Sequence, residues 1–156
     1  NGSVLYSGFR DGATAHGPSL PALVQEALAV SDVDEVVVGM GPGPFTGLRV
    51  GISFAHTFGL ARNIPVIGIC SLDAIAIDAN EYTVAIDARR KEIYWARYEN
   101  GTRVDGPHVS KPDQVDGFIF DVFPDMNKLV SLSTHQNVTE PMYLRRPDAV
   151  PTAERT

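Results

Sequence analysis

Apolar residues recur every third or fourth position near the start of the chain, which is the spacing of a helix with one apolar face. From Leu20 to Val30 this stripe predicts a helix, with Ser19 as its N-cap and Pro21 in its first turn. A strand is predicted next, over Val33–Gly39, because three consecutive valines are typical of a strand buried on both faces. The stripe consists of Leu20, Leu23, Val24, Ala27 and Leu28.

A glycine-rich segment joins this strand to a second helix. It reads Gly-Met-Gly-Pro-Gly-Pro-Phe-Thr-Gly-Leu-Arg-Val-Gly from Gly39 to Gly51, and the helix it enters is predicted to run over Thr46–Arg62 and to end at Asn63. Another buried strand, Pro65–Ile69, follows, and Ser71 is the expected cap of a further helix. Alternating strands and helices predict an α/β architecture with a right-handed crossover.

Beyond residue 81 the apolar period changes from that of helices to that of strands. Tyr82–Ile86 and Ile93–Tyr98 predict a hairpin closed by Asp87–Glu92. We therefore divide the chain into a first α/β lobe, residues 1–80, and a smaller second lobe, residues 81–156. Three further short strands are expected, over Ser3–Phe9, Phe118–Phe123 and Met142–Leu144.

The glycine-rich segment has two interpretations. Bare backbone N–H groups before a helix attract phosphate, so this is a nucleotide-proximal loop in one of them. The other is a tight structural turn, which is favoured because Pro42 and Pro44 remove two donors and no Gly-Lys-Ser/Thr ending follows. The loop residues concerned are Gly41, Gly43, Thr46 and Gly47.

The second helix carries two apolar stripes, whereas a surface helix normally has one. One stripe must pack on the sheet. The other is either buried within the domain or meets a partner, and the pattern alone favours neither. The first stripe is Leu48, Ile52, Ala55 and Gly59; the second is Val50, Phe54, Phe58 and Ala61.

Charge and composition exclude several classes of protein. The 156 residues carry a net charge of −6, so the surface as a whole repels phosphate and the chain is not expected to be the main grip on a nucleic acid. Cys70 is the only cysteine and lies in an apolar run, which favours a buried hydrophobic residue over a reactive thiol. The sequence shows no run long enough to span a membrane and no signal peptide, so a cytoplasmic location is expected.

Three motifs resemble the TsaB (YeaZ) family, which is related to TsaD and to the glycoprotease-like superfamily. The first is Gly-Pro-Gly-Pro-Phe-Thr-Gly-Leu-Arg-Val-Gly, with proline at Pro44 where the family usually has serine, followed by Ile-Pro-Val-Ile-Gly-Ile-Cys-Ser-Leu-Asp-Ala. The second runs from Asp87 to Ala96, and the third is Pro-Met-Tyr-Leu-Arg-Arg-Pro, beginning at Pro141. The resemblance covers most of the chain and is strongest from Val36 to Ala74.

The resemblance implies an actin/sugar-kinase-like (ASKHA) fold with two ribonuclease-H-like lobes. The family's opening strand, with its Asp-Thr-Ser-like loop, is not found in this sequence, and Gly106–Lys128 is shorter than the family's second lobe. Both lobes are therefore expected to be truncated.

The resemblance also implies a role. The expected protein is a non-catalytic scaffold that binds TsaD and acts with TsaE in making threonylcarbamoyladenosine next to the anticodon. It would reach tRNA only through the complex, pair with itself when alone, and leave ATP and metal to its partners. The interface is expected on Leu20–Val30 and Thr46–Arg62, through Leu20, Leu23, Val24, Ala27, Leu48, Ile52, Ala55 and Gly59.

Catalytic chemistry is not expected. The metal site of TsaD is His-Met-Glu-Gly-His, and Ser71 and Ile75 occupy the two histidine positions here. The histidines of this chain, His16, His56, His108 and His135, lack metal-ligand spacing. The best polar cluster, Asp87, Arg89 and Glu92, is equally consistent with a solvated turn. A metal-dependent glycoprotease-like hydrolase and a stand-alone nucleotide-binding ATPase remain the alternatives.

Overall fold

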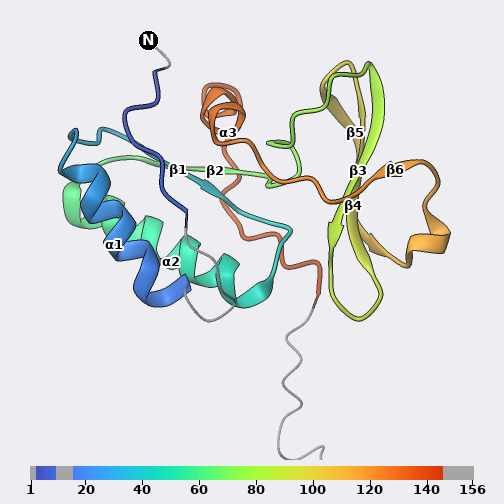
Figure 1. Ribbon diagram of the computed structural model, residues 1–156, viewed down its shortest axis with the longest axis horizontal. Helices are drawn as coiled ribbons and strands as arrows, with labels where there is room; N and C mark the ends of the chain where they lie inside the picture. Colours follow the sequence, from blue (N-terminus) through green and yellow to red (C-terminus); the bar gives the residue numbers. More distant parts are fainter. Residues whose placement is uncertain (1–2, 10–15, 146–156) are drawn as a thin grey trace, which may run out of the picture.

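The fold is built on two separate sheets, with helices around the first of them (Figure 1). The computed structural model describes residues 3–9 and 16–145. The first sheet has two parallel strands, and the second has four strands in the order β5-β4-β3-β6. In chain order the elements are α1 (His16–Leu28), β1 (Val36–Gly39), α2 (Phe45–Arg62), β2 (Val66–Ile69), β3 (Glu81–Asp87), β4 (Ile93–Glu99), β5 (Thr102–Ser110), a 3-10 helix (Pro112–Gln114), β6 (Phe118–Ile119) and α3 (Met126–Leu132).

The first sheet is covered by helices on both faces. Strands β1 and β2 pair in register from Val36 opposite Val66 to Gly39 opposite Ile69. Helices α1 and α2 lie on one side and α3 on the other (Figure 1). Because side chains alternate along a strand, Val66 faces α2 while Ile69 packs with Leu129 of α3.

The second sheet begins with the predicted hairpin. Strands β3 and β4 pair antiparallel along their whole length, and β6 joins β3 in parallel. One buried cluster joins this sheet to the segment that follows β2: Cys70, Leu72 and Ile75 pack with Val84 and Tyr98. The second sheet therefore packs against the segment that follows the first sheet, while β1 and β2 pack with α3 in a separate cluster.

The chain returns to the first sheet after β6. Val138 N–H donates to the Gly68 carbonyl at 2.7 Å, and Met142 N–H donates to the Met40 carbonyl at 2.8 Å. Helix α3 packs there as well. The predicted second lobe, residues 81–156, thus contains a stretch from about Asp125 to Met142 that belongs spatially with the first sheet.

One predicted helix is confirmed closely and another begins earlier than predicted. Helix α2 ends at Arg62, and Asn63 caps it in the left-handed conformation at φ 54°. Helix α1, in contrast, begins three residues before Ser19, so Ser19 is not its N-cap and Pro21 lies inside it. The prediction missed the first residues of α1 because the apolar stripe on which it was based begins only at Leu20.

Several predicted elements are wrong. Residues 71–74 form turns instead of a helix, and the Ser71 hydroxyl accepts from Gly41 N–H at 3.1 Å instead of capping one. Ser3–Phe9 and Met142–Leu144 are not strands. The strand expected over Phe118–Phe123 is reduced to β6, because Asp121 takes φ 57°, outside the extended region.

The structure also decides which face of α2 meets the sheet. Ile52, Ala55 and Gly59 are buried, and a Cβ built at Gly59 would lie 2.3 Å from Val66 Cγ2. The stripe that contains Ile52, Ala55 and Gly59 was expected to contact a partner, but it is the core face of α2. The expected assignment of the two stripes is therefore wrong. Val50, Phe54 and Phe58, of the second stripe, are only partly buried.

A matched pair of glycine substitutions tests this packing. We expect Gly59→Ala to destabilise the protein by about 1–3 kcal/mol, because its Cβ would overlap Val66. Gly51→Ala, in the same helix, has nothing within 4 Å of its added Cβ and should stabilise by about 0.5–1 kcal/mol. Urea unfolding of the two variants measures both effects. Equal stability would mean that α2 does not pack on β2 through Gly59.

Candidate functional site

A cleft of about 650 Å³ lies where the N-terminal end of α2 faces the end of β3. Gly43 and Gly47 of the predicted nucleotide-proximal loop line it, whereas Gly41 and Thr46 do not. The full lining is Pro42, Gly43, Pro44, Gly47, Leu48, Ser71, Ile86, Asp87, Arg89, Phe120, Asp121, Val122, Phe123 and Pro124. Most of these side chains are apolar, so the cleft suits a flat or apolar group more than a free ion.

Gly41 has a structural role beside the cleft. It is buried at φ 99°, and a Cβ there would lie 2.8 Å from Leu48 Cδ2 and 3.1 Å from the Met142 carbonyl oxygen. Only glycine combines this backbone conformation with so close an approach. This geometry matches the tight structural turn that the prolines favoured.

Three of the four polar residues that line the cleft, Ser71, Asp87 and Arg89, have partners. Asp87 Oδ1 accepts from Arg89 N–H at 2.7 Å, and Asp87 Oδ2 lies 3.3 Å from Arg89 Nη1. The Ser71 hydroxyl is bonded to Gly41, as described above. None of these contacts joins a nucleophile to a base, so the arrangement fits binding better than covalent catalysis.

The turn between β3 and β4 presents three basic residues at the edge of the cleft. Arg89, Arg90 and Lys91 all have positive φ, between 55° and 62°. This conformation costs a non-glycine residue about 1–2 kcal/mol each. The surroundings must therefore hold the turn in place.

Arg145 supplies much of that restraint. Its Nη1 donates to the Ala88 carbonyl at 2.6 Å, and its Nη2 lies 2.5 Å from Glu92 Oε2. The predicted polar cluster is thus only partly assembled: Asp87 meets Arg89, while Glu92 pairs with Arg145. Sequence spacing gave no signal for this pair, because its members are brought together only by the return of the chain.

A buried ionic cluster, also missed from the sequence, lies between the two sheets. Asp73, in the turn after β2, is 5% exposed. Tyr98 donates its hydroxyl to Asp73 Oδ1 at 2.8 Å, and Arg103 Nε lies 3.0 Å from the same oxygen. Arg103 also donates to the Gly106 carbonyl at 2.8 Å. A carboxylate buried this deeply is tolerable only because a cation and a hydroxyl compensate it.

Burial also determines the protonation of Cys70 and Tyr98. Desolvation, helped by the nearby Asp73 carboxylate, raises the pKa of the Cys70 thiol to about 11. The same two causes raise the pKa of Tyr98 above its usual range. Cys70 therefore remains a neutral thiol near pH 7, as its apolar sequence context predicted, and is a poor nucleophile.

Ser71 and Ile75, the two positions expected to match the histidines of TsaD, lie in different environments. Ser71 borders the cleft, and Ile75 is buried in the core. Within residues 3–9 and 16–145, the structure places no three histidine, cysteine, aspartate or glutamate side chains where they could share a metal ion. In the same ranges, none of the helices has the length and apolar character needed to cross a membrane.

Comparison with known proteins agrees with the α/β fold. A crystal structure of an uncharacterized Pseudomonas aeruginosa protein, described as similar to peptidase YeaZ, superposes with a TM-score of 0.70 at 24% identity, covering 83% of this chain and 84% of that one. A second Pseudomonas aeruginosa structure, YeaZ, gives a TM-score of 0.65, also at 24% identity, over 76% of both chains. The class is therefore a YeaZ-like α/β fold.

Sequence comparison identifies the family. The model described as TsaD, tRNA N6-adenosine threonylcarbamoyltransferase, matches residues 11–149. An uncharacterized protein of Mycobacterium bovis is 43% identical, over 86% of this chain and 74% of its own. TsaB of Escherichia coli, a tRNA threonylcarbamoyladenosine biosynthesis protein, is 37% identical over 55% of this chain and 43% of its own. The chain belongs to this TsaD-related family, and its resemblance to TsaB is confirmed.

The match covers a variable share of these relatives. An uncharacterized Mycobacterium leprae protein is 42% identical over 85% of this chain, yet the match spans only 44% of that relative. The chain thus spans less than half the length of this relative and of Escherichia coli TsaB.

A pair of carboxylate-to-amide changes tests the buried cluster. Asp73→Asn should cost about 3 kcal/mol, the lower end of the range for a buried pair, because the Arg103 side chain is 24% exposed and its charge would be only partly stranded. Glu99→Gln removes the exposed pair with Arg97 and should cost less than about 1 kcal/mol. Chemical denaturation measures both. Similar small losses would show that the two sheets do not depend on Asp73.

The thiol makes stability depend on pH in an alkaline window. An unfolded Cys70 ionises near pH 9.0, whereas the folded thiol keeps its proton to about 11. Above pH 9 the unfolded chain loses the Cys70 proton while the folded chain keeps it, which favours unfolding. The free energy of unfolding is therefore unaffected by Cys70 ionisation below pH 9 and decreases between pH 9 and 11, by up to about 1.4 kcal/mol per pH unit. Cys70→Ala should flatten this slope in urea titrations between pH 8 and 10.5. An unchanged slope would contradict the raised pKa.

Proposed function

We propose that this chain is a non-catalytic, cytoplasmic subunit that binds TsaD in the protein set making threonylcarbamoyladenosine in tRNA. Its homology to TsaB proteins supports the pathway. The lack of a nucleophile–base contact in the cleft, together with the neutral Cys70 thiol, supports a scaffold more than a hydrolase. ATP and metal would then be held by partner proteins, with TsaE as a further member of the set.

The α1–α2 surface is the observation that carries this proposal. Phe54 and Phe58 stack with ring centroids 5.8 Å apart, yet both remain partly exposed. Apolar side chains that remain accessible side by side are typical of a protein–protein contact.

Helix α1 extends the same surface. Its four predicted contact residues, Leu20, Leu23, Val24 and Ala27, are all partly buried, and the helix packs beside α2 (Figure 1). The docking surface is therefore α1 together with Val50, Phe54, Phe58 and Ala61 of α2, in place of the core-facing stripe. A second copy of the chain would use this surface when TsaD is absent, and tRNA would be reached only through the complex.

Two matched valine substitutions test the docking surface. Val50 on α2 and Val104 on β5 are both at least partly exposed, so arginine at either position should leave the fold intact. Burying an unpaired charge in an interface costs several kcal/mol, against about 8 kcal/mol for a micromolar complex. We expect Val50→Arg to weaken TsaD binding at least 100-fold, as measured by isothermal titration calorimetry, and Val104→Arg to have no effect.

Three other outcomes would contradict parts of the proposal. If Val50→Arg folds and binds TsaD as tightly as the unchanged chain, α2 is not the interface. If Val104→Arg alone abolishes binding, the second sheet carries the contact. Turnover of ATP or of a protein substrate by the purified chain, lost on changing Asp87, would favour one of the enzyme alternatives.

A further inference from the structure

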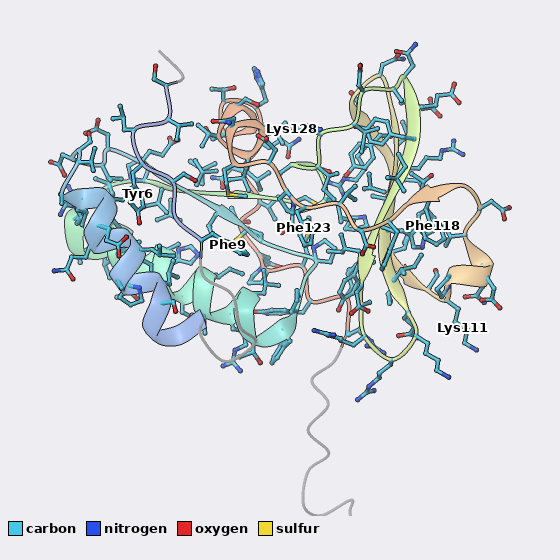
Figure 2. The ribbon with its side chains drawn as sticks, in the orientation of Figure 1. Tyr6, Phe9, Lys111, Phe118, Phe123 and Lys128 are labelled. Atoms are coloured by element: carbon cyan, nitrogen blue, oxygen red, sulfur yellow. The ribbon has the colours of Figure 1, made fainter. Side chains whose placement is uncertain are left out.

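The cleft combines two exposed aromatic side chains with one cation, Arg89, which pairs with the Asp87 carboxylate. Arg89 lines it from the β3–β4 turn, and Phe120 and Phe123 line it from the segment that leads to α3. Phe120 is 43% exposed and Phe123 is 83% exposed, which is unusual for phenylalanine. Figure 2 shows Phe123 near the middle of the molecule, between the two sheets.

Two more basic residues, Arg90 and Lys91, follow Arg89 along the turn. Lys91 is exposed there, two residues from Arg89, and the Arg89 side chain is 76% exposed. Arg145 fixes the shape of the turn through the Ala88 carbonyl and gives its own charge to Glu92. Asp87 pairs with Arg89 and Glu92 with Arg145, so the two carboxylates are matched by two cations and the turn carries Arg90 and Lys91 in addition. The turn is therefore a locally positive edge on a chain whose net charge is −6.

A nucleotide carries phosphate groups and a planar base, and the cation and the aromatic side chains of the cleft can contact one each. Cations follow a phosphate backbone, and bases stack on aromatic side chains whatever their sequence. Asp121 also lines the cleft, next to Phe120 in the chain. Its carboxylate would repel phosphate and accept a hydrogen bond from an exocyclic amino group of a base, so we place the base beside Phe120. A base must be unpaired to enter a pocket.

We infer that the cleft binds an unpaired nucleotide of an RNA chain, with the base against Phe120 and Phe123 and the backbone phosphates on Arg89 and Lys91. An RNA chain is favoured over a free nucleotide because the exposed Lys91 is not among the residues that line the cleft, so a phosphate on Lys91 would belong to a neighbouring nucleotide. The inference rests on the proposed role in tRNA modification and replaces one part of it: this chain contacts RNA directly, whereas the expected contact was only through the complex.

Charge variants of the full chain test the phosphate contact. The probe is a fluorescent single-stranded RNA of ten nucleotides, titrated at several salt concentrations. Each phosphate contact contributes about 0.7 to the slope of log affinity against log salt, so Arg89→Gln with Lys91→Gln should reduce that slope by about 1.4. The control, Arg62→Gln with Arg97→Gln, has the same net charge but removes cations of exposed ion pairs elsewhere, and should leave the slope unchanged.

An aromatic variant tests the base contact separately. Phe123→Ala should weaken RNA binding by about 5- to 100-fold, the usual value of one stacked base, without changing the salt slope. Because Phe123 is so exposed, the variant should remain folded. Binding to TsaD should be unaffected by the Arg89/Lys91 and Phe123 variants, whose residues are not part of the docking surface on α1 and α2, so a failure here is distinguishable from a failure of the proposed function.

Four results would overturn the inference. The first would be that the RNA does not bind the unchanged chain at any salt concentration. The second would be that the Arg89/Lys91 variant and its control lower the salt slope equally. The other two concern competitors. Free AMP displaces the RNA at equal nucleotide concentration, which would make the cleft a mononucleotide site. Poly-glutamate displaces the RNA while Phe123→Ala binds normally, which would assign the turn to an acidic protein surface.

Discussion

The buried carboxylate of Asp73 is the interaction on which the arrangement of the two sheets depends. It follows the first sheet in the chain, while Tyr98 and Arg103, which compensate it, belong to the second. An isolated charge at this depth would be strongly destabilising, so the carboxylate requires both partners in place. The cleft, whose walls come from the segments around α2 and β3, has a defined shape for the same reason.

Close approach of backbone segments is the second constraint. Gly59 lets α2 lie directly on Val66, and Gly41 lets the chain pass Leu48 and Met142 before the helix begins. These contacts place the N-terminal end of α2 at the cleft and leave its aromatic stripe beside α1. The same packing thus produces two separate surfaces, an apolar one on α1 and α2 and a cleft beside the β3–β4 turn.

These surfaces differ in chemistry as well as in position. The helical surface is apolar and offers Phe54 and Phe58, while the cleft combines Arg89 with Phe120 and Phe123. A chain with a net charge of −6 gains little from general attraction to nucleic acid. Any RNA contact must therefore be local, at a turn whose strained backbone Arg145 holds in place.

The sequence by itself determined the local elements whose signals were complete: α2 with its end at Asn63, the β3–β4 hairpin, and the neutral burial of Cys70. Periodicity and turn residues act between near neighbours, so these features needed no distant contact. Tertiary structure alone decided the rest. Both stripes of α2 are apolar with the same period, and only the space beside Val66 selects the one containing Gly59. The pairs of Asp73 with Arg103 and Glu92 with Arg145 join segments far apart in the chain, where no spacing rule applies.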